Sequence, residues 1–159
     1  EINRIADTSN IEVNQLVFIP NRKKVQAPPL TDAGNDDFIW PLKGTVISTF
    51  GQIFNNMINK GLNIRGFPNA EVVASRAGKI VFYGEDLSGF GKTVIIDHGD
   101  GFLTVYARNA EVFIKPGDSV SKGSVIARVG SWGRDKNTYL HFEIRKGSVS
   151  QNPFFYLSR

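Results

Sequence analysis

From Thr45 onward, the chain consists of short runs of β-branched and aromatic residues separated by Gly, Pro and Asp. Fifteen of the sixteen glycines lie at or after Gly44. Such runs predict strands, and Asp-Gly or Pro-Gly between them predicts tight turns. The predicted strands are Thr45–Thr49, Val72–Ala74, Lys79–Tyr83, Thr93–Asp97, Leu103–Ala107, Ser124–Val129 and Tyr139–Arg145. We therefore predict a mainly β fold, an antiparallel sandwich or sheet with few short helices. Gln52–Lys60 is predicted to be either a short helix or a loop.

Alternation along two of these strands predicts a binding groove. In the last strand, one face consists of Leu140, Phe142 and Ile144, and the other of Tyr139, His141, Glu143 and Arg145. In the strand that begins at Leu103, the polar side consists of Thr104, Tyr106 and Arg108. We expect the apolar faces in the core and the polar faces on the floor of a groove.

The region before the strands has a different character. Residues 21–39 are polar, contain Pro28-Pro29 and lack periodicity, which is typical of a linker. Residues 1–20, with the run INRIADTSNIEVNQLVFIP, resemble the C-terminal half of a LysM repeat, a module that binds the N-acetylglucosamine backbone of peptidoglycan. The predicted organisation is a truncated LysM-like module at 1–20, a linker at 21–39 and a compact domain at 40–159. Any signal peptide or lipid anchor is then expected upstream of residue 1.

Composition excludes several classes of function. The formal net charge is 19 − 15 = +4, and no basic helix or aromatic RNA-binding pattern accompanies it, so we predict no nucleic-acid partner. No apolar run approaches the roughly 18 residues of a membrane-spanning helix. The chain has no Cys, which excludes disulfides, thiolate zinc sites and cysteine nucleophiles. His98 and His141 are the only histidines.

Five segments follow one another in an order that covers nearly all of residues 40–157. They are WPLKGTVISTFG, KGLNI, VVASRAGKIVFYGEDLSGFGKTVIIDHGDGFLTVYA, IKPGDSVSKGSVIARVG, and LHFEIRKG with the following NPFFYL. Together they resemble the LytM (lysostaphin-type) zinc endopeptidase domain. The resemblance implies a sheet-based fold with a duplicated hybrid motif, a groove and a peptidoglycan context.

The resemblance also marks where the zinc site of active members would lie. That site consists of His-x-x-x-Asp, a His after a Tyr-x pair, and His-x-His; the first His, the Asp and the last His bind zinc, and the other two assist catalysis. Gly61 sets the register of the first piece. The matching positions here are Asn59, Asn63, Arg108, Tyr139 and His141. By this register only His141 retains the residue type of the active family.

The chemistry of these replacements argues against a metal. Zinc binds His, Cys or carboxylates, usually three in a catalytic site, whereas an Asn amide is neutral and a poor donor. Arg108 is permanently cationic and cannot act as a base. Tyr139 is a weak base at neutral pH because a phenol has a pKa near 10. His98 lies in a turn, at a position that is not a ligand in the family. We predict no cofactor, no metal and no peptidase activity.

Each of these residues also has a simpler interpretation. His141 is either an ordinary sheet histidine or a former ligand that contacts a partner. Asn59 and Asn63 either cap turns or contact a partner. Arg108 pairs with Glu143, is solvated, or anchors a carboxylate of a partner. Asp97, Asp100 and Asp118 are interpreted as turn formers.

A LysM-like fragment, a linker and a LytM domain without metal ligands are similar to murein hydrolase activators of the NlpD and EnvC type. The resemblance implies a non-enzymatic regulator in the periplasm or cell envelope, with any outer-membrane anchor upstream. It implies activation of N-acetylmuramoyl-L-alanine amidases during cell division and daughter-cell separation, through a groove lined by Asn59, Asn63, Arg108, Tyr139 and His141. The alternative is a passive peptidoglycan-binding or envelope scaffold module.

Overall fold

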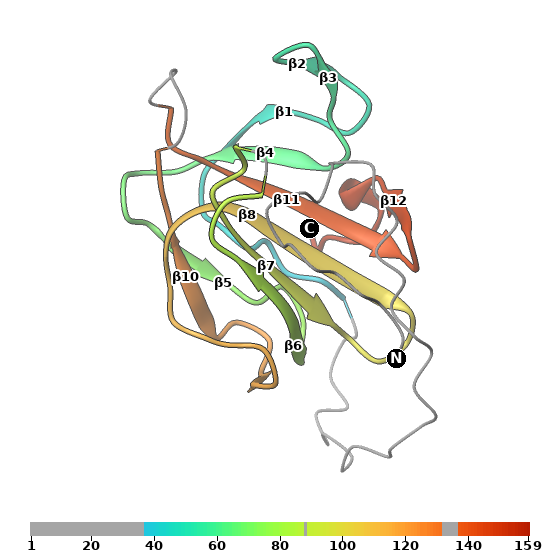
Figure 1. Ribbon diagram of the computed structural model, residues 1–159. Coiled ribbons are helices and arrows are strands. Elements are labelled where there is room, and N and C mark those ends of the chain that lie inside the picture. The colour runs from blue at the N-terminus through green and yellow to red at the C-terminus, as the bar shows by residue number, and fades with distance from the viewer. Residues whose placement is uncertain (1–36, 88, 132–136) are drawn as a thin grey trace, which may run out of the picture.

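The computed structural model describes residues 37–131 and 137–159, apart from Ser88 (Figure 1). The predicted LysM-like segment and most of the predicted linker lie outside these residues. The described strands are β1 (Thr45–Ser48), β2 (Ile53–Phe54), β3 (Met57–Ile58), β4 (Leu62–Arg65), β5 (Glu71–Val73), β6 (Gly78–Gly84), β7 (Lys92–Asp97), β8 (Phe102–Val112), β9 (Ser119–Val120), β10 (Val125–Val129), β11 (Tyr139–Lys146) and β12 (Val149–Gln151). A short 3-10 helix follows at Pro153–Phe155. Within the described residues, no helix has the length and apolar character needed to cross a membrane.

One ten-stranded sheet forms the body of the domain. Its main path runs β1-β4-β11-β8-β7-β6-β9, and all neighbours on this path are antiparallel. β10 pairs with β5 and with the end of β8, and β12 forms a hairpin with β11 (Figure 1). The prediction of a mainly β, antiparallel fold is confirmed.

β8 bends at Arg108. Its first part, up to Ala107, pairs with β11, whereas Asn109, Glu111 and Val112 pair with β10. The register of β8 shifts against both β7 and β10 near this point, and Arg108 adopts a φ of 70°. A left-handed backbone is uncommon for a non-glycine residue, and an irregularity of this kind bends a strand. The bend places Arg108 where the strand turns from one set of neighbours to another.

The buried residues confirm which face of β11 was predicted to enter the core, but they contradict the prediction for β8. Leu140, Phe142 and Ile144 are fully buried, as expected. Thr104 and Tyr106 were expected on the groove floor, but they pair with Ile144 and Phe142 and are fully buried in the core. That prediction is wrong because alternation shows which residues share a face, not which face is covered. Buried hydroxyls are tolerated when they find hydrogen-bond partners.

Gln52–Lys60 forms a β-hairpin, so both the helix and the loop predictions are wrong. β2 and β3 pair Ile53 with Ile58 and Phe54 with Met57. The turn between them consists of Asn55 and Asn56, with φ of 49° and 63°. A two-residue type I′ turn requires positive φ at both positions, and Asn is one of the few residues that tolerate it.

The folded domain begins before Trp40. Phe38 is 3% exposed, and its ring packs against those of His98, Phe102 and Tyr156, with centroids 5.3, 5.8 and 6.3 Å away. The Phe38 carbonyl accepts a hydrogen bond from the Ser158 amide at 2.7 Å. Phe38 and Ile39 were assigned to the linker from the sequence. In the structure, Phe38 is joined to residues near the end of the chain, and the Ile39 amide donates to the Ser75 carbonyl at 2.9 Å.

Candidate functional site

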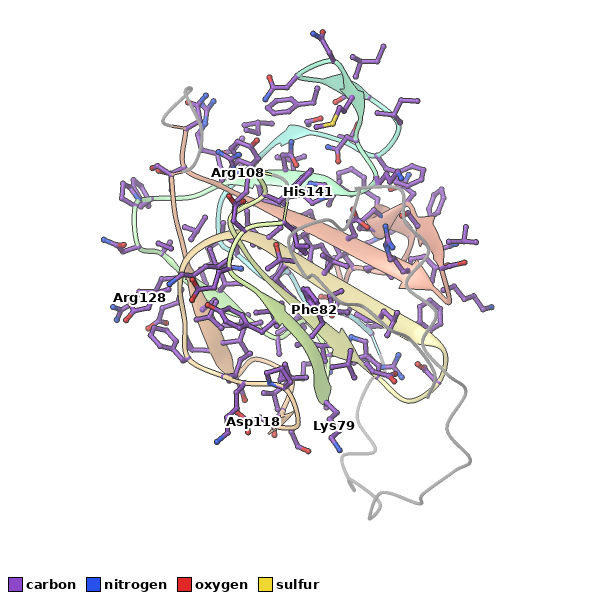
Figure 2. The ribbon with its side chains drawn as sticks, viewed as in Figure 1. Lys79, Phe82, Arg108, Asp118, Arg128 and His141 are labelled. Atoms are coloured by element: carbon purple, nitrogen blue, oxygen red, sulfur yellow. The ribbon has the colours of Figure 1, made fainter. Side chains whose placement is uncertain are left out.

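A groove of about 470 Å³ opens beside the β2–β3 hairpin, over parts of β4, β8 and β11. Its lining residues are Phe54, Asn55, Met57, Ile58, Asn59, Lys60, Asn63, Gly89, Phe90, Arg108, Tyr139, His141 and Glu143. All five residues that the sequence singled out are among them. Figure 2 shows Arg108 and His141 in the upper half of the view, away from Lys79 and Asp118 at the bottom of the domain.

Sheet register brings these distant residues together. β4 and β11 pair so that Asn63 lies opposite His141, although the two are 78 residues apart. β11 and β8 pair so that His141 also lies opposite Ala107, the neighbour of Arg108. Tyr139 precedes His141 by two residues and therefore faces the same side of β11. The site is thus assembled from the centre of the sheet.

Asn59 has a clear local role. Its Nδ2 donates to Ser48 Oγ at 2.9 Å, and its Oδ1 accepts from the Gly61 amide at 3.0 Å. The side chain is buried, and it holds the turn that leads into β4. Gly61 is required in this turn because a Cβ there would meet the Phe142 carbonyl oxygen at 2.0 Å. The turn-capping interpretation of Asn59 therefore describes its contacts.

His141 is held at both ring nitrogens. Nδ1 lies 2.8 Å from Asn63 Oδ1, and Nε2 lies 3.0 Å from Glu143 Oε1. Burial by itself raises the pKa of Glu143, but hydrogen bonds and charges from His141 and Arg145 outweigh it and hold the pKa below its usual value. Glu143 is therefore ionised at neutral pH, and Nε2 donates to it.

Arg108 stacks on Tyr139. Its guanidinium carbon lies 3.8 Å from the centre of the Tyr139 ring, and Nη2 donates to the Asn137 carbonyl at 3.3 Å. Arg108 is only 6% exposed, so it is not a solvated surface residue. A cation over an aromatic face in a largely desolvated site is attracted by roughly 2 kcal/mol. This pair gives one groove wall a fixed positive charge.

Two aromatic residues of the groove were missed by the sequence analysis. The Phe54 ring lies 5.6 Å from the Tyr139 ring, and the Phe90 ring lies 5.4 Å from the His141 ring. The Phe90 carbonyl also accepts from the Arg108 amide at 2.8 Å. Phe90 stands between Gly89 and Gly91, and an aromatic residue in such a loop is the pattern that would have revealed it.

The groove residues do not fit a zinc ion. Both side-chain polar atoms of Asn59 bond within the protein, and Asn63 and His141 bond each other. Among residues 37–131 and 137–159, Ser88 apart, no three His, Cys, Asp or Glu residues form a group suited to a metal. The donor set of two amides and one imidazole, beside a guanidinium, does not match the ligands that zinc prefers.

The other residues considered from the sequence lie elsewhere. His98 bonds the Ala77 carbonyl through Nδ1 at 2.8 Å and Thr104 Oγ1 through Nε2 at 2.9 Å, and burial lowers its pKa. The three turn carboxylates accept backbone N–H groups, as turn formers do. These bonds join Asp97 to Gly99, Asp100 to Phe102 and Asp118 to Lys115.

Comparison with known families agrees with this geometry. The profile of peptidase family M23 matches residues 57–153. The chain belongs to peptidase family M23. The resemblance to lysostaphin-type domains is confirmed.

Relatives of known name share more than a third of the aligned residues. Murein hydrolase activator NlpD of Escherichia coli is 40% identical over 118 residues, which cover 74% of this chain and 30% of NlpD. Outer membrane antigenic lipoprotein B of Haemophilus influenzae is 37% identical over 147 residues, covering 92% and 35%. Cell division protein DipM of Caulobacter vibrioides is 36% identical over 113 residues, covering 71% and 19%. This chain thus spans about a third or less of their length.

Solved structures share the fold. A chain of the SpoIIQ–SpoIIIAH pore-forming complex superposes with a TM-score of 0.70 at 27% identity, covering 77% of this chain and 92% of that one. Lysostaphin from Staphylococcus simulans superposes with a TM-score of 0.69 at 24% identity, covering 78% and 55%. This chain therefore shares its overall fold with these structures.

Proposed function

We propose that this chain is a non-enzymatic regulator of cell-wall remodelling that activates N-acetylmuramoyl-L-alanine amidases during cell division and daughter-cell separation. Its groove, whose described residues form no metal-ligand set, would bind a segment of the amidase. The proposal is supported by relatives named as a murein hydrolase activator and a cell division protein.

One observation carries this proposal: the groove keeps an ordered wall although its chemistry cannot support zinc hydrolysis. Asn63, Arg108 and His141 each make defined contacts inside it. The groove has a volume of about 470 Å³, and aromatic side chains form part of its lining, as is typical of binding sites. Binding a protein needs only shape and a few anchors, which Arg108 and the aromatic residues of the groove would supply.

The hairpin beside the groove favours a protein partner. Ile53 and Ile58 are 78% and 68% exposed, and Met57 is 51% exposed. Residues 50–59 carry no charged side chain. Apolar surface of this kind is typical of protein–protein contacts rather than of binding to a charged, polar polymer.

Activation requires a difference in affinity between two states of the amidase. If the groove binds the open state a few kcal/mol more tightly than the occluded one, the open state becomes dominant. We further propose a location in the cell envelope, an anchor upstream of residue 1, and a LysM-like module at 1–20 that holds the domain near peptidoglycan.

The direct test is dye release from labelled peptidoglycan by a purified amidase from the same organism, with and without this chain. We expect the chain to stimulate release and to release nothing alone. Release by the chain alone would contradict the ligand argument. Sedimentation with purified sacculi without any change in amidase rate would favour the passive scaffold.

A matched pair of variants tests the groove. Arg108→Gln removes the buried cation on Tyr139, and Arg128→Gln removes an exposed cation that pairs with Glu111 at 3.4 Å (Figure 2). We expect Arg108→Gln to raise the concentration for half-maximal activation about tenfold. Arg128→Gln should leave it unchanged, and equal effects would count against the groove.

A further inference from the structure

We propose that Glu143 is a positioning residue of the groove, which fixes the His141 ring with its Nδ1 edge against Asn63 in the wall that the partner contacts. This inference rests on the proposed function, because it assumes that a partner binds against this wall. Glu143 was not among the five residues singled out from the sequence, and it acts through His141 rather than by its own contact with the partner.

The position of Glu143 on β11 suits this role. It lies two residues after His141 and therefore on the same face of the strand. Its Oε1 stands 3.0 Å from Nε2, while Asn63 Oδ1 stands 2.8 Å from Nδ1 on the other side of the ring. Turning the imidazole over would place carbon atoms against both oxygens and lose both bonds.

The charge of Glu143 determines which ring nitrogen carries a hydrogen. An ionised carboxylate only accepts hydrogen bonds, so Nε2 is protonated whether the ring is neutral or charged. Asn63 matches Nδ1 in either case, because its amide offers an oxygen to N–H and an NH₂ group to a lone pair. The ring orientation therefore survives a change in its own protonation.

Glu143 is itself held from behind. Its Oε2 accepts from Arg145 Nε at 2.6 Å and from Ser150 Oγ at 3.4 Å. Its side chain is 9% exposed, which leaves little room for another rotamer. The contacts run from Ser150 on β12 through Glu143 and His141 to Asn63 on β4, so they join three strands.

This arrangement follows a rule known from metal sites. A carboxylate behind a ligating histidine orients the imidazole toward the metal. Here the carboxylate and the imidazole are present, and the Asn63 amide occupies the position in front of Nδ1. The same orienting device then gives the groove wall a single shape without any ion, and the Phe90 ring packs against it at 5.4 Å.

The first test is spectroscopic and needs no partner. In ¹⁵N NMR of the wild-type chain at neutral pH, we expect the His141 Nε2 to be protonated and its hydrogen to exchange slowly. Glu143→Leu should abolish the slow exchange, whereas Glu143→Gln should keep it through its remaining oxygen. The proposal would be overturned if the wild-type His141 ring were protonated only at Nδ1, or if its two tautomers interconverted rapidly.

The second test uses amidase activation. Glu143→Leu is expected to raise the concentration for half-maximal activation about tenfold, which corresponds to about 1.4 kcal/mol, with the maximal rate unchanged. Glu143→Gln should restore it to within about twofold of wild type. Glu111→Leu, which removes an exposed carboxylate paired with Arg128, is the matched control and should have no effect. Equal behaviour of Glu143→Leu and wild type would overturn the proposal.

Two further measurements distinguish a failure of this proposal from misfolding of the variant and from a failure of the proposed function. If Glu143→Leu does not fold, Arg145→Leu removes the clamp behind Glu143 at a side chain that is 30% exposed, and we expect a smaller rise in the half-maximal concentration. In that case, an unchanged half-maximal concentration for Arg145→Leu would overturn the proposal. If the wild-type chain activates no amidase, the proposed function fails, and the NMR arm alone decides the role of Glu143.

Discussion

The two histidines of the chain show how the same side chain serves two regions differently. His98 and His141 each bond through both ring nitrogens. The partners of His98 are a backbone carbonyl and a hydroxyl within the domain. The partners of His141 are an amide and a carboxylate that line an open groove. A network closed within the domain stabilises it, whereas one that borders a cavity is available to a ligand.

The His98 region binds the start of the domain to its core. Thr104 Oγ1 and the Tyr106 hydroxyl lie 3.0 Å apart, and the hydroxyl accepts from the Ser75 amide at 2.9 Å. The Ser75 carbonyl accepts from Ile39 at 2.9 Å. Phe38 packs edge-on against the His98 ring. We therefore expect changes in this region to affect stability, and changes in the groove to affect binding of the partner.

The largest effect is expected from Phe38→Ala. Phe38 is 3% exposed, and its ring packs against other aromatic rings. Removing the ring leaves a cavity and should lower the free energy of unfolding by about 3–5 kcal/mol. Urea denaturation measures this loss. Under conditions where the variant is folded, it should still activate the amidase. A loss of activation by the folded variant would contradict the assignment of stability to the His98 region and of partner binding to the groove.

Tyr106→Phe should have the next largest effect. The change removes the hydroxyl and leaves the buried Ser75 amide without its acceptor, at a cost of about 1–3 kcal/mol. Urea denaturation of this variant beside Tyr83→Phe, whose hydroxyl is exposed and bonds Glu85 at 3.3 Å, gives the comparison. If both variants lost the same free energy of unfolding, the buried hydrogen bonds of Tyr106 would stabilise the domain no more than an exposed one does.

The two histidine regions should lose stability in different pH ranges. Burial lowers the pKa of His98 from 6.5, against the attraction of Asp97 and Asp100 and with the help of Arg76. Its neutral form is favoured on folding, so this contribution is complete above pH 6.5 and is lost as the pH falls through the folded pKa. The pKa of Glu143 lies below 4.5, so its contribution is complete above pH 4.5 and is lost at lower pH.

Thermal unfolding across pH tests this difference. His98→Gln should remove the decline that begins near pH 6.5 and keep the one that begins near pH 4.5. Glu143→Gln should remove the decline that begins near pH 4.5 and keep the one that begins near pH 6.5. A wild-type stability that stays constant from pH 7 to pH 5 would contradict the role assigned to His98.

The smallest effect on stability is expected on the hairpin. Changing Ile53 and Ile58 to Ser should alter the free energy of unfolding by no more than about 0.5 kcal/mol, because both side chains are largely exposed. The same double variant should weaken amidase activation. Phe67→Ser, at an 83% exposed residue outside the groove lining, is the control. Equal loss of activation by both variants would indicate a general effect of surface hydrophobicity.

The candidate site was largely readable from the sequence because its positions follow short motifs. Gly61 sets the register that places Asn59 and Asn63, and the alternation of β11 places Tyr139 beside His141. The hydrogen bond that His141 Nε2 donates to Glu143 could not be predicted from the sequence. Neighbours on one strand face share a side, but whether they bond depends on rotamers that Arg145 and Ser150 determine.

What the amino-acid sequence alone determined is chemical and local. Its β-branched runs and glycine turns predicted the antiparallel strands, and the resemblance to lysostaphin-type domains placed amides and a guanidinium where active members have zinc-site residues. Tertiary structure decided which face of β8 enters the core, that Phe38 belongs to the domain, and that the segment from Gln52 to Lys60 pairs as a hairpin. These outcomes depend on contacts between residues far apart in the chain and on the positive φ of Arg108, which no local pattern specifies.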